Sequence, residues 1–140
     1  MMSSATLTVP AEAASVTRCT EFVAGCAKAA GFPMARVAAL ELVVEEVVLN
    51  ICSYAYGEVP GEIQVCCETV ASEDFVLEFS DSGRPFNLLT LPPPDLTVGI
   101  DERQVGGLGV PLVRAMAETA TYRRDNDRNI LRLSVPLPHR

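Results

Sequence analysis

Two residue types at a four-residue spacing could carry chemistry in this chain. Glu46 and Asn50 lie within the segment 41–50, which is largely apolar but also holds Glu41 and Glu45, and side chains four apart are neighbours on one face of a helix. A carboxylate can accept a proton, and an amide oxygen can bind a hard cation such as Mg²⁺. The alternative is a solvated helix edge that happens to carry both residues, because polar pairs at this spacing are common.

The segment around this pair favours a helix over a strand. A strand would place Glu45 and Glu46 on opposite faces and drive one of them into the core. We therefore predict a helix from about Met34 to about Cys52, with Glu41 and Glu45 on the edge opposite Glu46. Helical spacing also gathers an apolar stripe wide enough to face a core: Val37, Leu40, Val44, Val47, Val48 and Ile51.

Two later segments add candidates for ligand binding. The sequence DSGRPF at 81–86 directly follows an alternating strand pattern, and GGLG at 106–109 precedes a helical pattern with Pro111 near its start. Glycines before a helix expose backbone N–H groups, and the helix dipole favours an anion there. Taken alone, each segment could equally be a plain turn.

The remaining patterns predict a sheet and its connections. Alternation over 62–69 and 75–79 predicts an antiparallel hairpin with its apolar face under the helices. We also expect an edge strand at 6–9, a helix over 11–30 capped by Gly31, and strands at 119–124 and 129–136 joined by the turn 125–127. Segment 87–105 is the one long irregular stretch, which is either functional and mobile or a plain connecting loop.

Composition narrows the class of protein. The 140 residues suit a single domain spanning 1–140. A net charge of −7 argues against binding to nucleic acid or to an anionic membrane, and no apolar run is long enough to cross a bilayer. The N-terminus lacks a signal-peptide pattern. Five cysteines without CxxC spacing predict reduced thiols in a cytoplasmic protein and no zinc site.

In chain order, these motifs resemble the ATP-binding fold shared by gyrase, the heat-shock chaperone ATPases, histidine kinases and MutL, the GHKL superfamily. Within it, "EEVVLNICSYAYG", "DSGRPF" and "GGLGVPLVRAMAE" look like the three motifs of the bacterial anti-sigma factor serine/threonine kinases. The closing "NILRLSVPL" looks like their last strand, and the resemblance covers nearly the whole chain from about Val16 onward. It implies an α+β fold: a two-layer α/β sandwich of the Bergerat type, whose mixed, mostly antiparallel sheet is covered on one face by about three helices.

Residue by residue, the resemblance implies a site for ATP and Mg²⁺. Glu46 would be the general base that takes the proton from a serine or threonine hydroxyl, and Asn50 would coordinate the Mg²⁺ that bridges the triphosphate. Asp81 would accept a hydrogen bond from the adenine amino group, and Gly83 would let the backbone approach the base. The phosphates would be lined by Gly106, Gly107, Leu108 and Gly109.

Segment 87–105 would be the flexible lid over this site. Three further residues are candidates. Arg103 and Arg114 are the positive charges near the glycine motif, and both could equally be surface residues. Asn129 falls where the family often has a threonine near the base, or it is a structural residue at the start of a strand.

The implied function is an ATP-binding anti-sigma regulatory factor. It would be a Mg²⁺-dependent serine/threonine kinase that phosphorylates a STAS-type anti-anti-sigma partner, sequesters a sigma factor, or does both, and it would act as a homodimer. Tyr54 and Gln104-Val105 stand where members of the family often have basic residues. These departures motivate two alternatives, namely a nucleotide-sensing binding module without chemistry and a slow ATPase that uses water as the nucleophile.

Overall fold

The computed structural model describes residues 3–92 and 109–139. The helices are α1 (Val16–Ala29), α2 (Met34–Asn50) and α3 (Gly109–Met116), with short turns η1 (Ala13–Ser15), η2 (Ile51–Tyr56) and η3 (Leu88–Thr90). The strands are β1 (Ser3–Pro10), β2 (Glu62–Val70), β3 (Asp74–Asp81), β4 (Thr119–Asp125) and β5 (Arg128–Pro136).

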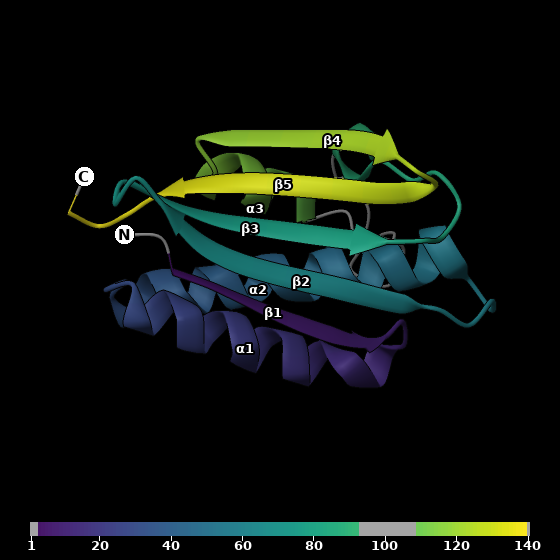
Figure 1. Ribbon diagram of the computed structural model, residues 1–140, viewed down its shortest axis with the longest axis horizontal. Helices are drawn as coiled ribbons and strands as arrows, with labels where there is room; N and C mark the ends of the chain where they lie inside the picture. The colour runs from purple at the N-terminus through teal and green to yellow at the C-terminus, as the bar shows by residue number, and fades with distance from the viewer. Residues whose placement is uncertain (1–2, 93–108, 140) are drawn as a thin grey trace, which may run out of the picture.

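These elements form the predicted two layers, with α1, α2 and α3 together on one face of the sheet (Figure 1). The strand order is β1-β2-β3-β5-β4. Every pairing between these strands is antiparallel, so the described sheet is wholly antiparallel where a mixed one was expected. No helix in the described ranges is long and apolar enough to cross a membrane.

The predicted antiparallel hairpin is confirmed, and so is the prediction of which of its side chains face the core. β2 and β3 pair antiparallel with Val65 opposite Phe79, and both side chains are buried in the core. Cys67 is buried with them, whereas the adjacent Cys66 is partly exposed on the other face, as the two-residue period requires. All five cysteines are free.

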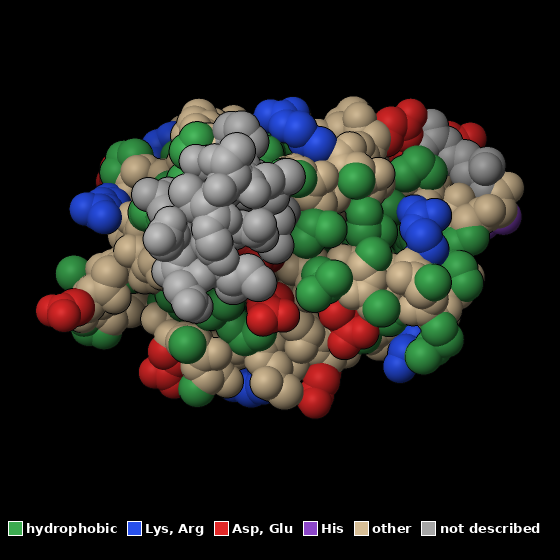
Figure 2. Space-filling view, turned by 180° about the vertical axis from the view of Figure 1, so that it is seen from behind, with side chains coloured by type: hydrophobic (Ala, Val, Ile, Leu, Met, Phe, Trp, Pro, Cys, Tyr) green, Lys and Arg blue, Asp and Glu red, His purple; other side chains and the backbone are tan. Residues whose placement is uncertain are grey.

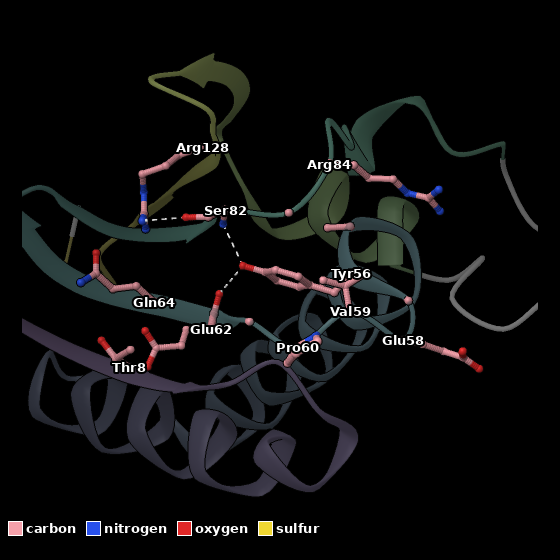
Figure 3. Close-up of a pocket in the computed structure, with 14 residues that line it drawn as sticks. Thr8, Tyr56, Glu58, Val59, Pro60, Glu62, Gln64, Ser82, Arg84 and Arg128 are labelled. Carbon is pink, nitrogen blue, oxygen red and sulfur yellow. Dashed lines mark hydrogen bonds between the residues drawn. The ribbon is translucent and has the colours of Figure 1, made fainter.

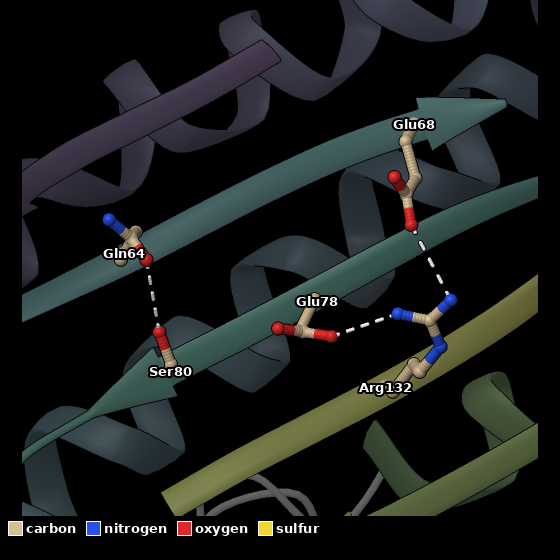
Figure 4. A network of polar contacts seen from close by, with 5 residues as sticks. All are labelled: Gln64, Glu68, Glu78, Ser80 and Arg132. Carbon is tan, nitrogen blue, oxygen red and sulfur yellow. Dashed lines mark hydrogen bonds and ion pairs between the residues drawn. The ribbon is translucent and has the colours of Figure 1, made fainter. Parts of the chain in front are cut away.

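The face of the sheet away from the helices carries polar contacts (Figure 4). Arg132 of β5 bonds Glu78 of β3 at 3.0 Å and Glu68 of β2 at 3.4 Å. Beside it, Ser80 donates to Gln64 at 3.5 Å. Partly exposed ion pairs of this kind contribute little stability. The main hydrophobic core lies on the other face of the sheet, between the strands and the helices. The candidate site lies on that side too.

The predicted apolar stripe of α2 is buried throughout. Val43 lies outside that stripe and is buried as well, because α2 packs against α1 and α3 in addition to facing the sheet. The α-helix ends at Asn50, and the chain continues as the π-helix η2 to Tyr56 where we expected an end near Cys52. Single π-turns are rare and often occur at functional sites.

The predicted turn residues behave as expected. Gly31 adopts a φ of 95° after α1, and Phe32 N–H donates to Ala27 O at 3.1 Å, which is the Schellman closure of a helix. Asn126 and Asp127 have φ values of 49° and 61°, as a two-residue hairpin turn between β4 and β5 requires. Most of the predicted lid, 87–105, lies outside the described residues.

Candidate nucleotide-binding site

Glu46 lies on α2 and presents a carboxylate oxygen without a partner. Its Oε2 atom is buried and has no hydrogen bond to any described residue. Burial raises the pKa of Glu46, and the neighbouring Glu45 carboxylate raises this pKa further. A buried acceptor without a donor is unfavourable, and such groups often occur at functional sites. This is the state expected of a general base, while the role itself stays a prediction.

Asn50 lies one turn beyond Glu46 and is almost completely buried. Its Nδ2 donates to the backbone oxygen of Glu46 at 2.6 Å. This bond holds the donor end of the amide against the helix. The acceptor end, Oδ1, is therefore the atom that Asn50 would offer to a cation.

Gly109, the last glycine of the third motif, lies against this pair. A Cβ at Gly109 would lie 3.1 Å from the Glu46 Cβ and 3.7 Å from Asn50 Nδ2. A side chain here would press α3 away from α2. The fold thus brings Glu46, Asn50 and Gly109 together.

Asp81 ends β3 and is 2% exposed. Its Oδ1 accepts hydrogen bonds from Gly83 N–H and from Asn129 Nδ2, both at 2.9 Å. Burial raises the pKa of Asp81, and these two bonds oppose that rise, followed by the charges of Arg124 and Arg128. Asp81 is therefore a buried acceptor fixed by its neighbours.

Asn129 is the residue that organises the surroundings of Asp81. It is buried, and Nδ2 donates both to Asp81 and to Arg84 O. Its Oδ1 accepts from Phe86 N–H at 3.1 Å, Tyr122 OH at 2.6 Å and Arg124 Nη1 at 3.1 Å. Asn129 thus ties β4 and β5 to the DSGRPF loop.

Sequence reasoning missed Tyr122 and Arg124 as part of this cluster. A signal was present. Tyr122 and Arg124 lie two and four residues after Ala120, so all three are on the same face of β4. Ala120 pairs with the buried Leu133, which marks this face as the inward one. A polar residue on the inward phase of a strand requires a partner, and here that partner is Asn129.

The structure explains why residue 83 is a glycine, which the sequence did not reveal. A Cβ at this position would lie 2.6 Å from Ala55 O, so only glycine lets the loop approach the end of η2 this closely. Arg84 completes the contact: its N–H donates to Ala55 O at 2.9 Å and its Nε donates to Tyr54 O at 2.6 Å. The π-helix therefore presents carbonyl groups that hold the second motif in place.

Tyr54 stacks on Phe86, with ring centroids 5.1 Å apart and an interplanar angle of 18°. It occupies the position where the resemblance implied a basic residue. The tyrosine therefore contributes to packing between the first and second motifs.

The space beside Asp81 is nearly closed. A cavity of ≈ 10 Å³ lies between Asp81, Asn129 and Ile51, with Phe86 and Leu88 among its walls. Pockets for small molecules are usually about 300–1,000 Å³. An adenine could enter only if the segment that carries Phe86 and Leu88 moves.

A much larger cavity of ≈ 870 Å³ lies on the other side of the DSGRPF loop (Figure 3). Ser82, Gln64, Arg128 and the loop 57–61 line it, and the buried Tyr56 donates its hydroxyl to Glu62 O and accepts from Ser82 N–H. None of Glu46, Asn50 and Asp81 lines this cavity. Gly83 does line it, so the cavity adjoins the predicted site at that residue.

The other candidates are less informative. Arg103, Gly106, Gly107 and Leu108 lie outside the described residues, and Arg114 is exposed in the last turn of α3. Within the described ranges, no three His, Cys, Asp or Glu side chains are grouped so that they could hold a metal ion. The donor set that remains is an amide and one carboxylate, which suits Mg²⁺ bound mainly through water and substrate phosphates.

A family model described as the histidine kinase-like ATPase domain matches residues 9–135 of this chain. A comparison with curated proteins found no match.

Two solved structures share the fold. The first is the blue-light activated histidine kinase of Erythrobacter litoralis EL346, with a TM-score of 0.58 and 18% identity over 91% of this chain and 42% of that one. The second is the histidine kinase domain of the same protein, with a TM-score of 0.56 and 18% identity over 92% of this chain and 62% of that one. This chain therefore spans less than two thirds of either structure.

Proposed function

The chain belongs to the histidine kinase-like ATPase domain family, and from this premise we propose that it binds ATP with Mg²⁺ and transfers a phosphoryl group to a serine or threonine of a protein partner. The observation that carries the proposal is the buried Oε2 of Glu46, which has no hydrogen-bond partner among the described residues and lies beside Asn50 and Gly109. Nothing in the described packing requires a carboxylate at this position. A role in chemistry supplies the reason.

Each residue has a definable part in this function. The raised pKa of Glu46 makes its carboxylate a stronger base than an exposed glutamate. Oε2 can then take the proton of the acceptor hydroxyl. Asn50 offers Oδ1 to the cation, and Gly109 leaves room for phosphate beside both residues. Bound Mg²⁺ would screen the charge of the triphosphate and orient it.

Asp81 provides the selectivity for adenine. Both hydrogen bonds that reach it from described residues go to Oδ1, so we assign Oδ2 to the adenine amino group. Guanine carries a carbonyl at that position, and two acceptors facing each other would be unfavourable. When ATP binds, Phe86 and Leu88 move apart from Asp81 and open the nearly closed space beside it.

The partner that we propose is a STAS-type anti-anti-sigma protein or a sigma factor, with the chain acting as a homodimer in the cytoplasm. Resemblance of the three motifs supports this assignment. The net charge of −7 supports a protein partner over nucleic acid.

One observation favours a second function, a nucleotide-sensing module without transfer. Tyr54 packs on Phe86 and brings no positive charge to the site. ATP binding would then move Phe86 and, through Arg84 and Tyr54, the π-helix η2 that follows α2.

The deciding experiment incubates the chain with γ-labelled ATP, Mg²⁺ and a STAS-type protein from the same host, with the Glu46→Gln variant as control. Label on a partner serine or threonine with the parent, and none with the variant, supports the kinase. Nucleotide binding without label supports the sensing module. Release of phosphate without a protein acceptor indicates a slow ATPase.

A further inference from the structure

Three donors hold the side-chain amide of Asn129 in one orientation. The backbone N–H of Phe86 and the guanidinium of Arg124 can only donate, and both meet the same Asn129 atom at 3.1 Å. That atom is therefore the oxygen, Oδ1, and the hydroxyl of Tyr122 donates to it as well, at 2.6 Å. The opposite end of the amide, Nδ2, must then face Asp81 Oδ1, which it meets at 2.9 Å.

Two of these donors do not depend on the segment that must open for adenine. Phe86 belongs to the wall of the nearly closed space beside Asp81, and its N–H would leave Asn129 when that wall moves. Tyr122 and Arg124 lie on β4, which pairs with β5 and so stays beside Asn129. Tyr122 also lines the nearly closed space itself. In the open state, the orientation of the amide therefore depends on Tyr122 and Arg124.

The orientation of this amide decides whether Asp81 can remain a pure acceptor. A flipped amide would place Oδ1 of Asn129 against Oδ1 of Asp81, and two facing acceptors are unfavourable. A proton on Asp81 would relieve this contact and would turn the carboxyl group into a donor. A carboxylate accepts from the adenine amino group, whereas a protonated carboxyl group can donate to the guanine carbonyl. The amide orientation therefore affects the choice between the two purine bases.

The positive charges that act on Asp81 come from β4 and β5. The helical face of the molecule presents acidic side chains among hydrophobic ones (Figure 2). Burial raises the pKa of Asp81, and its two hydrogen bonds and then the charges of Arg124 and Arg128 oppose that rise. On the side of η2, the titratable group that interacts with Asp81 is Tyr56. Loss of Arg124 would therefore remove a cation that favours the ionised carboxylate.

We infer that Tyr122 and Arg124 are positioning residues for base selection, because they hold the neighbouring amide so that Asp81 stays an acceptor and selects adenine. This rests on the proposed function, since selection has a meaning only if Asp81 meets a purine base. Arg124 has a second part: its Nη1 also donates to Gly83 O at 2.7 Å and thereby holds the DSGRPF loop against the strand.

The test compares nucleotide selectivity in matched variants of the full chain. Tyr122→Phe keeps the ring and removes the hydroxyl, Arg124→Gln removes the charge, and Arg124→Lys keeps the charge. The control is Arg123→Gln, which changes the net charge equally at an exposed residue on the opposite face of β4. Competition against a fluorescent ATP analogue with Mg²⁺ measures Kd for ATP and for GTP over a pH series, and circular dichroism confirms that each variant is folded.

We expect the ratio of ATP affinity to GTP affinity to fall about tenfold when Tyr122→Phe and Arg124→Gln are combined, which corresponds to about one hydrogen bond. Arg124→Lys and Arg123→Gln should keep the parental ratio. The combined variant should also lose its preference for ATP at a higher pH than the parent, because the ionised form of Asp81 has lost a cation and a fixed donor. An unchanged ratio, or an equal loss of both affinities, overturns the inference.

A readout without nucleotide separates this inference from the proposed function. NMR can follow the titration of the Asp81 carboxyl group, which should occur at a higher pH in the combined variant than in the parent and in Arg123→Gln. Unchanged titration together with normal ATP binding contradicts the inference alone. A parent chain that binds neither nucleotide contradicts the proposed function and the base selection that rests on it.

Discussion

Gly109 packs directly over Glu46: a Cβ on the glycine would lie 3.1 Å from the Cβ of the glutamate. This contact brings the first and third motifs directly together. Oε2 of Glu46 is buried and has no hydrogen-bond partner in the described part of the chain, because a glycine offers no side chain to bond it. A ligand that enters here therefore meets an acceptor without a competing partner.

The Glu46→Gln variant should lose phosphoryl transfer by about 10²–10⁴-fold, because an amide cannot accept the hydroxyl proton. ATP binding should persist, since Asn50 and Asp81 remain. Rates with labelled ATP and affinities from calorimetry measure the two effects. Unchanged transfer in the variant would exclude Glu46 as the base.

The same variant should change how stability depends on pH. The folded-state pKa of Glu46 is raised, so the folded state binds the proton more tightly than the unfolded state does. Stability associated with this group is present below its ordinary pKa and is lost as pH rises through the folded-state pKa. We expect Glu46→Gln to be more stable than the parent at pH 7, with the gap closing in acid. Thermal unfolding over a pH series measures this, and an equal gap at every pH would contradict it.

Asn129→Ala should destabilise the fold by about 1–3 kcal/mol, because it leaves buried partners without their bonds. It should also reduce the preference for ATP over GTP, because Asp81 loses one of the two donors that fix it. Urea unfolding and competition binding measure these effects. The exposed Thr121→Ala on β4 serves as control, and loss of stability with an unchanged nucleotide preference would limit Asn129 to a structural role.

Two glycines should respond to alanine in opposite ways. Gly83→Ala forces a Cβ against the backbone of Ala55 and should cost about 1–3 kcal/mol. Gly25→Ala in α1 meets open space and should stabilise by about 0.5–1 kcal/mol, since alanine favours a helix. Chemical denaturation of both variants measures this, and a neutral Gly83→Ala would show that the loop contact with η2 is loose.

Mg²⁺ should bind this chain only together with a nucleotide. The described residues offer one amide and one carboxylate at the site, and Mg²⁺ usually needs substrate phosphates to complete such a set. Calorimetry should show no heat with Mg²⁺ alone and a Mg²⁺-dependent gain in ATP affinity that Asn50→Ala removes. Tight binding of Mg²⁺ without ATP would place the metal elsewhere.

Much of the fold was predictable from interactions between residues that are close together in the sequence. The alternation that buries Val65, the cap at Gly31 and the turn at Asn126 each follow from neighbouring residues. The helix carrying Glu46 and Asn50 was predictable because a strand would have driven either Glu45 or Glu46 into the core. These features need no knowledge of distant contacts.

Contacts between distant segments were not predictable in the same way. The need for glycine at position 83 arises from the approach of the loop to Ala55, and the π-helix after Asn50 had no signal in the local pattern. Burial of Val43 depends on the arrangement of α1, α2 and α3. Asn129 was noticed for its place in the last strand, but its role as the partner of Asp81 appears only when β3 and β5 pair.

The most direct test is a crystal structure of the full chain with Mg²⁺ and a non-hydrolysable ATP analogue. We predict the adenine amino group on Asp81 Oδ2, the metal on Asn50 Oδ1, the phosphates beside Gly109, and Phe86 and Leu88 displaced from the closed space. A nucleotide bound instead in the ≈ 870 Å³ cavity lined by Ser82 and Arg128, with the space at Asp81 still closed, would contradict the assignment.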